Sequence, residues 1–244
     1  MLSRMAEPSS CNPTGADTGI RDGFRHVQDW IFDLDNTLYR ADNGIFAQID
    51  GRMTAFVAQL LGMERDAARQ IQKQLYRDHG TTLAGLIAMH KIDPEPYLDF
   101  VHDIDLSELQ PDPALIAALT RLPGRRFVFT KGCRHHAMRI LERLELADMF
   151  EQVWDIRTIG FVPKPAQAAY DAVVTAGSVT PARAAMFDDI ARNLVLPHEL
   201  GMTTVWLDGQ SDWSRQGPDF PVASKAHIDH ETRDLCSFLN SIGI

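Results

Sequence analysis

Two aspartates stand two positions apart, Asp33 and Asp35, directly after the apolar run at 30–32. A carboxylate can attack phosphorus to form an aspartyl-phosphate, provided that a cation such as a magnesium ion offsets its repulsion of the phosphate. The second carboxylate, from the same loop, can protonate the leaving alkoxide and later take a proton from water. This pair predicts phosphoryl-transfer chemistry. The alternative is that the two aspartates only end a strand and cap a turn.

Thr130 and Lys164 are suited to hold the phosphate in such a reaction. A hydroxyl followed by backbone amides at a helix start, as at Thr130, suits a non-bridging phosphate oxygen, although Thr-x-Gly ends many strands. Lys164 stands between Pro163 and Pro165, which restrict the backbone on both sides. We expect this lysine to balance the charge of the acidic residues and of the phosphoryl group. An ordinary surface lysine is the alternative.

Asp188 and Asp189 form a second acidic cluster, after the apolar run at 184–187. Adjacent carboxylates repel each other unless a cation lies beside them. Magnesium prefers oxygen ligands and often needs only one or two carboxylates, with water in the remaining positions. The cluster therefore predicts a Mg²⁺ site close to Asp33. A solvated helix cap is the alternative.

Short apolar runs that stop at acidic or turn residues predict buried strands. Four such runs occur, at 27–32, 126–129, 184–187 and 203–207. Helical patterns separate them, at 113–121, 137–144 and 166–174. This alternation favours a doubly wound α/β fold with a parallel sheet covered on both faces. Ligands of such sheets bind beyond the carboxyl ends of the strands, where all the clusters above are expected.

A long insertion lies between the first two strands, at 44–109, with helical stripes and no strand signal. Its clearest stripe consists of Ile45, Ile49, Met53, Phe56, Val57, Leu60 and Leu61. The segment is too long for a loop, so we predict a small helical cap, with the core formed by 24–43 and 110–244. Residues 1–23 are predicted to be a flexible leader. The apolar spacing at 235–242 predicts a helix that packs on the core.

The composition narrows the possible partners and the compartment. A net charge of -9 over 244 residues argues against binding to a nucleic-acid polymer, which needs a concentrated cationic face. No apolar run is long enough to span a bilayer. The three cysteines form no CxxC pair and no disulfide framework, so we expect a cytoplasmic protein. A metal ion and one or two local cations can still attract a small phosphorylated metabolite, and the oligomeric state stays open.

Four motifs, in this order, resemble the haloacid dehalogenase (HAD) superfamily of phosphohydrolases: DLDNT at 33–37, FTKG at 129–132, PKP at 163–165 and FDD at 187–189. The resemblance covers residues 27–207 and includes a helical cap between the first two motifs. Three further stretches are similar to the pyrimidine 5′-nucleotidase branch: DLDNTLY at 33–39, HGTTL at 79–83 and VHDIDLS at 101–107. The resemblance therefore implies both the fold and a hydrolytic reaction.

The same resemblance implies a role for each candidate residue. It implies that Asp33 is the nucleophile and that Asp35 is the acid/base and gives Mg²⁺ a main-chain carbonyl. It also implies that Thr130 binds the phosphate and that Lys164 neutralises it. The later acidic pair would complete the metal site, with Asp189 as the direct ligand. The presence of Asp35 favours a phosphohydrolase over a true dehalogenase.

Lys131 departs from the family pattern, which usually has asparagine after the motif threonine. Lysine cannot accept a hydrogen bond and brings a mobile charge. It could bind the phosphate, or it could pair with Asp33 and slow the attack. We expect normal metal binding in either case.

The resemblance also suggests the substrate, a small nucleotide such as UMP or CMP, with the cap closing over the nucleoside. Phe46, Phe56 and Tyr76 are candidates for stacking on the base and also for the interior of the cap. A sugar phosphate or phosphoglycolate is the second hypothesis. The third is a catalytically weak regulatory or binding protein with the altered Lys131.

Three other polar residues are not assigned to the site. His135 and His136 would point about 100° apart on a predicted helix, so we expect both to be ordinary helix residues. Cys133 lies near the predicted phosphate site, but nothing in the sequence pairs it with a histidine. We expect it to be a bystander thiol.

Overall fold

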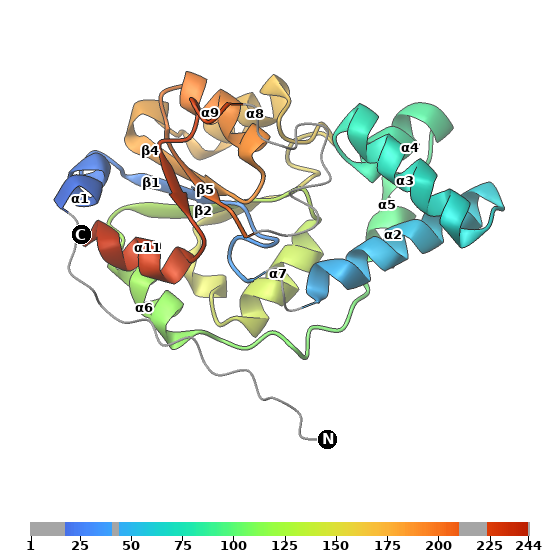
Figure 1. Ribbon diagram of the computed structural model, residues 1–244, viewed down its shortest axis with the longest axis horizontal. Coiled ribbons are helices and arrows are strands. Elements are labelled where there is room, and N and C mark those ends of the chain that lie inside the picture. Colours follow the sequence, from blue (N-terminus) through green and yellow to red (C-terminus); the bar gives the residue numbers. More distant parts are fainter. Residues whose placement is uncertain (1–17, 41–43, 210–223, 244) are drawn as a thin grey trace.

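The computed structural model describes residues 18–40, 44–209 and 224–243. In that part of the chain the centre is a parallel sheet with helices on both sides (Figure 1). Its six strands lie in the order β3-β2-β1-β4-β5-β6. The strands are β1 Asp29–Phe32, β2 Arg125–Phe129, β3 Gln152–Trp154, β4 Ala184–Asp188, β5 Thr203–Leu207 and β6 His230–Thr232. Because β1 pairs with β2 on one side and β4 on the other, the loop after β1 leaves the sheet between those of its neighbours.

The register of the central strands brings the candidate residues to one edge of the sheet. Phe32 of β1 is level with Val128 of β2 and with Phe187 of β4. Asp33 and Asp188 follow two of these residues directly, and the backbone amide of Asp33 donates to the carbonyl of Phe187 at 2.8 Å. The two aspartates therefore begin side by side, as the carboxyl ends of parallel strands must.

Successive residues of the strands enter two different hydrophobic cores. Trp30 and Phe32 pack with helices α1, α6, α7 and α11 on one face, and Ile31 packs with α8 and the cap helices on the other. The helices outside the cap are α1 Thr18–Phe24, α6 Pro113–Arg121, α7 Arg134–Arg143, α8 Gln167–Gly177, α9 Val195–Glu199 and α11 Leu235–Ile242. Short 3₁₀ helices occupy η2 Ala147–Met149, η3 Pro181–Arg183 and η4 Ala191–Leu194. This is the predicted doubly wound fold, and burial on both faces explains the continuous apolar runs of its strands.

The predicted strands and core helices are confirmed, but two strands carry no signal in the sequence. β3 and β6 have three residues each and form the two edges of the sheet. An edge strand is covered less than a central one, so polar residues such as Gln152 and Glu231 are tolerated there. No apolar run marks either strand for this reason.

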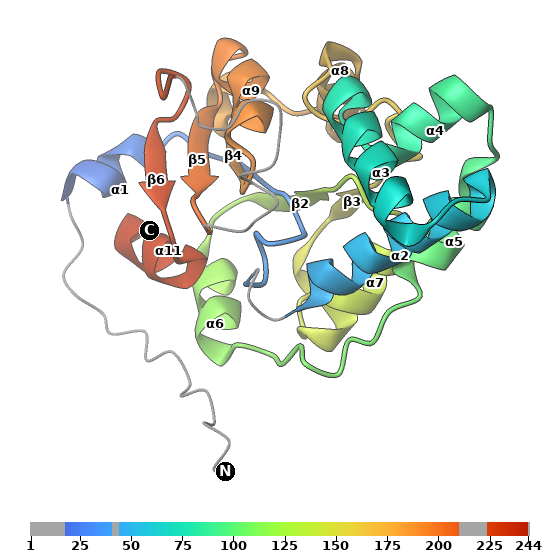
Figure 2. The same ribbon diagram turned by 45° about the vertical axis from the view of Figure 1, so that its right-hand side comes forward.

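Four helices occupy the predicted insertion and lie to one side of the sheet (Figure 2). They are α2 Ile45–Leu61, α3 Arg65–His79, α4 Thr82–His90 and α5 Pro94–His102. The side chain of Thr81 caps α4, that of Asp93 caps α5, and Gly62 ends α2 in the left-handed conformation. The predicted helical stripes are confirmed, while the division of the chain into a cap and a core as separate domains stays a prediction.

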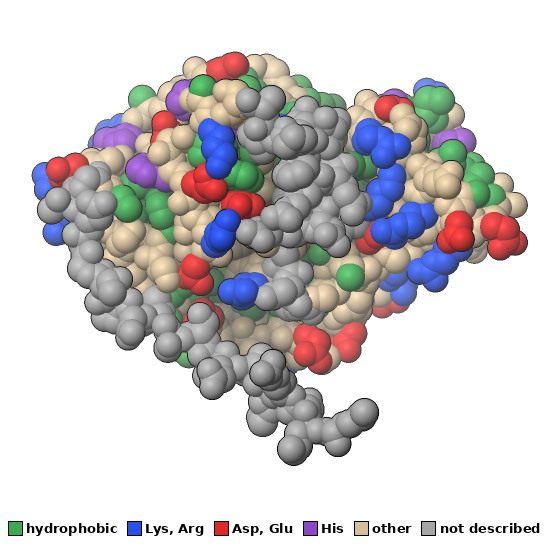
Figure 3. Space-filling view, viewed as in Figure 1, with side chains coloured by type: hydrophobic (Ala, Val, Ile, Leu, Met, Phe, Trp, Pro, Cys, Tyr) green, Lys and Arg blue, Asp and Glu red, His purple; other side chains and the backbone are tan. Residues whose placement is uncertain are grey.

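A buried carboxylate fixes two of the cap helices to each other. Asp50 on α2 is only 6% exposed and accepts hydrogen bonds from Arg69 and Gln72 on α3, each at 2.7 Å. Lys73 lies 3.4 Å from the same carboxylate. Lys and Arg side chains gather over the cap on the face drawn in Figure 3. Because the buried charge is fully paired, it holds α2 and α3 in one relative position.

The segment predicted to be a leader differs in part from that expectation. Residues 1–17 lie outside the described part of the chain, but Thr18–Phe24 forms helix α1. Phe24 is fully buried and stacks on Trp30, with 5.8 Å between the ring centroids. The predicted C-terminal helix is confirmed as α11, which packs on the same core.

No helix among the described residues is long and apolar enough to cross a bilayer. Cys133 and Cys236 are free thiols, and Cys11 lies outside the described residues. The cytoplasmic location inferred from the cysteines stays a prediction.

Candidate active site

Asp33 lies at the carboxyl end of the central strand and is buried with both of its oxygens in contact with the protein. Its Oδ1 accepts a hydrogen bond from Nζ of Lys164 at 2.7 Å. Its Oδ2 accepts one from the hydroxyl of Thr37 at 3.3 Å. Burial, more than any neighbour, raises the pKa of Asp33 to about 7 in the absence of a metal ion. The carboxylate therefore needs further positive charge to stay ionised and nucleophilic at neutral pH.

Lys164 is the buried cation of the site and has no donor left over. It is fully buried, and its ammonium group contacts Asp33 Oδ1 at 2.7 Å, Asp188 Oδ2 at 2.7 Å and the carbonyl of Phe129 at 2.8 Å. An ammonium group has three hydrogens, so these contacts use all of them. Burial alone would lower the pKa of Lys164, but Asp188 and Asp33 outweigh it and raise the pKa above its usual value. Lys164 therefore acts first as the counter-charge of the two aspartates.

Asp33, Asp188 and Asp189 form a buried acidic triad whose possible ligand oxygens lie within 4.8 Å of one another. Asp188 uses Oδ2 for the lysine, and its Oδ1 accepts from the amide of Ile190 at 2.9 Å and from Asn193 at 2.8 Å. Three oxygen donors at this spacing suit a hard divalent cation such as Mg²⁺. The residues present therefore fit such a cation, although Asp188 has no oxygen without a protein partner.

Asp189 is the member of the triad with the fewest partners. Its carboxylate has one contact among the described residues, from Asn36 at a long 3.4 Å. Burial, and then the negative charges of Asp33 and Asp188, raise the pKa of Asp189 well above its ordinary value. Its backbone carbonyl accepts a hydrogen bond from the indole of Trp206 at 3.0 Å. A cation beside Asp189 would remove the cost of this buried charge.

Asp35 sits in a different environment, because both of its hydrogen bonds fall on one oxygen. The hydroxyl of Tyr39 lies 2.6 Å from Oδ1, and Nε2 of His136 lies 2.9 Å from the same atom. Burial would raise its pKa, but His136 and then the Tyr39 hydrogen bond outweigh it and lower the pKa of Asp35. Oδ2 has no partner in the described part of the chain, so this oxygen is available for proton transfer.

Lys131 does not form the ion pair with Asp33 that was one of its two predicted roles. Its Nζ is shielded from solvent and has no hydrogen-bond partner among the described residues. It also lines the cavity above the carboxylates. Burial, and then the nearby charge of Lys164, lower the pKa of Lys131 from 10.5 to about 8. An unpaired cation in this position is suited to an anionic ligand.

Thr130 lies deeper than the other candidates. It is fully buried, and its hydroxyl oxygen accepts a hydrogen bond from the amide of Gly132 at 2.9 Å. Lys131 and Gly132 contribute to the wall of the cavity, whereas Thr130 lies behind them. The structure thus brings together all seven predicted site residues, and the Thr130 hydroxyl holds the loop whose next two residues line the cavity.

The carboxylates Asp33, Asp35 and Asp189 face a cavity of about 120 Å³ between the sheet edge and the cap. The cap supplies a mostly apolar wall to it, from Phe46, Ile49, Met53, Tyr76, Leu83, Tyr97, Leu98 and Val101. Of the three aromatic residues predicted to stack on a base, Phe46 and Tyr76 line the cavity. Phe56 instead packs edge-on against Tyr97, with 5.0 Å between the ring centroids, inside the cap.

Comparison with known proteins gives the family. The model of the haloacid dehalogenase-like hydrolase family matches residues 31–195. The chain belongs to this family. It is therefore a HAD-like hydrolase, and the four motifs identified in the sequence fall within the matched region.

Relatives of this HAD-like hydrolase agree with the fold. Phosphate metabolism protein 8 of Saccharomyces cerevisiae is 29% identical to this chain over 134 residues. The match covers 51% of this chain and 42% of the yeast protein, so this chain spans less than half of that relative. A HAD phosphatase from Thermococcus onnurineus has a TM-score of 0.56 at 19% identity, with 85% of this chain and 94% of that chain covered. The HAD hydrolase YfnB from Bacillus subtilis, whose structure was bound to magnesium, has a TM-score of 0.56 at 15% identity, with 89% and 99% covered. At these identities the solved structures establish the fold alone.

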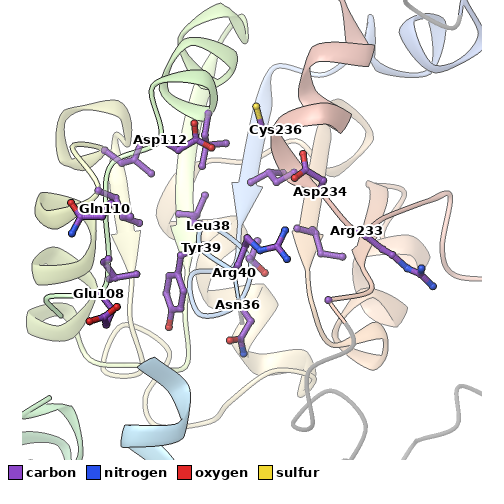
Figure 4. Close-up of a pocket in the computed structure, with 18 residues that line it drawn as sticks. Asn36, Leu38, Tyr39, Arg40, Glu108, Gln110, Asp112, Arg233, Asp234 and Cys236 are labelled. Atoms are coloured by element: carbon purple, nitrogen blue, oxygen red, sulfur yellow. The ribbon is translucent and has the colours of Figure 1, made fainter. Parts of the chain in front are cut away.

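A larger cavity of about 360 Å³ is lined by residues 36–40 of the loop that follows β1 (Figure 4). Tyr39 lines it with its ring, while its hydroxyl holds Asp35. Charged residues line it as well, including Arg40, Glu108 and Arg233. The acidic triad of this HAD-like hydrolase does not belong to that lining, so the smaller cavity is the candidate active site.

Two histidines near Asp35 were not expected to take part in the site. His135 is exposed and is an ordinary helix residue, as predicted, but the same expectation for His136 is wrong, because its ring is fully buried against Asp35. Nδ1 of His102 lies 3.3 Å from the sulfur of Cys133, so the expectation that this thiol has no histidine partner is also wrong. His136 and Asp35 are 101 positions apart, and no local pattern in the sequence indicates that they meet.

Proposed function

We propose that this HAD-like hydrolase is a magnesium-dependent phosphate monoester hydrolase that forms an aspartyl-phosphate on Asp33. One observation carries the proposal: two carboxylates of one loop face the same cavity in opposite environments. Asp33 adjoins a buried cation and two further carboxylates, whereas Asp35 has one oxygen held by two donors and the other free. Added positive charge beside Asp33 would keep it ionised for attack, and the free oxygen of Asp35 is the atom from which a proton can be given and taken.

The reaction would proceed in two steps on these residues. In the first, a carboxylate oxygen of Asp33 attacks phosphorus, the bond from phosphorus to the ester oxygen breaks, and Oδ2 of Asp35 gives the leaving alkoxide a proton. In the second, the same oxygen of Asp35 takes a proton from water, and this water attacks the phosphorus of the aspartyl-phosphate. Phosphate is released and Asp33 is restored.

Asp33, Asp189 and the main-chain carbonyl of Asp35 are the residues that we propose to hold Mg²⁺. When bound there, Mg²⁺ would offset the negative charges of the nucleophile and of the phosphate. Asp188, whose two oxygens are already used, would support the site through Lys164 and Asn193. The buried, almost unpaired carboxylate of Asp189 supports this assignment.

Lys131 is proposed to bind the phosphoryl oxygens. Lys164 has used its three hydrogens on protein oxygens, so the free donor of Lys131 is better placed to meet the charge of the substrate. Thr130 would contribute by fixing the loop that carries the amide of Gly132. In this assignment Lys131 assists turnover instead of slowing it.

For the substrate we propose a mononucleotide such as UMP or CMP, on the sequence resemblance and on the aromatic rings of Phe46 and Tyr76 in the cavity wall. The volume of about 120 Å³ favours a second candidate, a small ester such as phosphoglycolate or a short sugar phosphate. Ligand sites for larger molecules usually exceed about 300 Å³. A nucleotide would therefore require the cap to stand further from the core than it does here.

The test is phosphate release from a panel of mononucleotides, sugar phosphates and phosphoglycolate, with magnesium or with a chelator. The parent, Asp33→Asn and the exposed control Asp148→Asn would be compared. We expect release that needs magnesium, is lost in Asp33→Asn and is unchanged in Asp148→Asn, and the preferred ester identifies the substrate class. A folded parent that binds magnesium but releases no phosphate from any ester would refute the enzymatic proposal and favour the regulatory alternative.

A further inference from the structure

Asp35 receives its two protein hydrogen bonds on the same oxygen from two different parts of the core. Tyr39 comes from the loop that carries Asp35 itself, and His136 comes from helix α7. Both donor-to-acceptor distances are below 3.0 Å, and both hydrogen bonds end on Oδ1. Two fixed donors on one oxygen restrict rotation of the carboxylate and leave Oδ2 directed away from them.

The two ring nitrogens of the buried His136 side chain have different surroundings. Its side chain is fully buried, and Nδ1 has no hydrogen-bond partner among the described residues. A carboxylate only accepts, so Nε2 carries the hydrogen that points at Asp35. Asp35 is therefore the one hydrogen-bond partner of the His136 side chain among the described residues.

The ring of His136 is held from the cap side by His102. The two rings stack with 4.3 Å between centroids and 20° between their planes, and His102 is the last residue of helix α5. Nδ1 of His102 lies 3.3 Å from the sulfur of Cys133 at the start of α7. A Cβ atom at Gly132 would lie 3.0 Å from Cδ2 of His136, so the loop passes close to the ring. The His136 ring is thus buried between His102, the loop at Gly132 and Asp35.

We propose that His136 is a positioning residue for the reaction: it fixes Oδ1 of Asp35 so that Oδ2 gives and takes the proton, and His102 of the cap keeps the His136 ring in place. The inference rests on the proposed phosphatase function and adds a residue on which that function depends. It also makes the cap a contributor to proton transfer, in addition to its contribution to the cavity wall.

The test uses His136→Phe, which keeps a flat ring for the stack with His102 but removes the donor, and His136→Gln, which keeps a donor at similar reach. kcat/KM would be measured for an alkyl phosphate, whose leaving group needs a proton, and for p-nitrophenyl phosphate, whose leaving group does not. Because kcat/KM covers the steps up to departure of the leaving group, it isolates the acid role of Asp35. We expect His136→Phe to lose about 10- to 100-fold with the alkyl ester and less than about threefold with the aryl ester.

His136→Gln should regain most of the activity on the alkyl ester, and the exposed neighbour variant His135→Phe should match the parent on both esters. Should His136→Phe fail to fold, Tyr39→Phe removes the other donor to Oδ1 at constant shape and should give the same difference between the esters. Equal losses on the two esters, or no loss, in a folded variant of an active parent would overturn this inference alone. A parent inactive on both esters would overturn the proposed function as well.

Discussion

Replacing Lys164 with methionine would remove the cation from the centre of the acidic triad at nearly constant volume. In the parent, the ammonium group lies 2.7 Å from both Asp33 and Asp188 and is fully buried. Without it, these carboxylates and Asp189 would remain close together in the interior, and Asp33 and Asp188 would lose the ammonium group that contacts them both. The variant should therefore be less stable, and its stability should depend on an added cation.

The magnitude follows from the burial of the pair. Removing one partner of a buried ion pair costs roughly 3–5 kcal/mol, because an uncompensated charge stays behind. For a chain of this size that corresponds to a fall in Tm of roughly 6–20 °C. Magnesium should restore part of the loss, since a ligand at 100 times its Kd stabilises the folded state by about 2.7 kcal/mol. The gain should be larger in Lys164→Met than in the parent, because the variant has one internal cation fewer.

The assay is urea unfolding of the parent and Lys164→Met, each with a chelator and with excess magnesium. Lys225→Met serves as the matched control, because that lysine forms an exposed ion pair with Glu231 and should change stability by less than about 1 kcal/mol. A Lys164→Met protein as stable as the parent in chelator would refute the view that the lysine offsets the buried acids. The same gain from magnesium in both proteins would refute the predicted exchange of one cation for another.

Three further changes test other parts of the site and the fold. Asp35→Asn should lower kcat on an alkyl phosphate by roughly 10²–10⁴-fold while inhibition by inorganic phosphate is retained, which steady-state kinetics would measure. Since the pKa of Lys131 is lowered to about 8, this lysine loses its charge as pH rises from 7 to 9, so inhibition by phosphate should weaken over that range in the parent and not in Lys131→Asn. Asp155 accepts hydrogen bonds from the amides of Arg134 and Thr158. Burial would raise the pKa of Asp155, but the hydrogen bonds from the hydroxyl and amide of Thr158 and from the amide of Arg134 outweigh it and lower the pKa. The ionised carboxylate of Asp155 therefore stabilises the folded state above the ordinary pKa of about 3.9, and this stabilisation is lost as pH falls below it. Asp155→Asn should lower the free energy of unfolding, measured in urea, by roughly 1–3 kcal/mol at pH 7 and by much less at low pH.

The sequence predicts the features of this protein that arise from local patterns. Each central strand is a continuous apolar run because both of its faces are buried, and the carboxylates stand out at the points where Phe32 and Phe187 end those runs. The cap is predictable for a similar reason, since its helices carry apolar stripes and capping residues such as Thr81 and Asp93. The family motifs then assign the chemistry of the strand ends.

The features that the sequence does not indicate depend on contacts between distant segments. His136 is one of two neighbouring histidines on a helix, and only the packing of α7 against the loop after β1 distinguishes it from the exposed His135. The sequence also could not decide between the two predicted roles of Lys131, pairing with Asp33 or binding the phosphate. The answer depends on a distant residue, because Lys164 directs its three hydrogens to Asp33, Asp188 and the carbonyl of Phe129. The edge strands β3 and β6 lack a signal because edges need no apolar run.

Trp206 gives this protein an internal optical reporter. Its indole donates to the backbone carbonyl of Asp189, so its emission should respond when the charge beside that aspartate changes. Trp30 and Trp154 lie in other strands, and a Trp206→Phe variant would supply the background to subtract. Metal occupancy could then be followed in real time by fluorescence, without a substrate and independently of turnover.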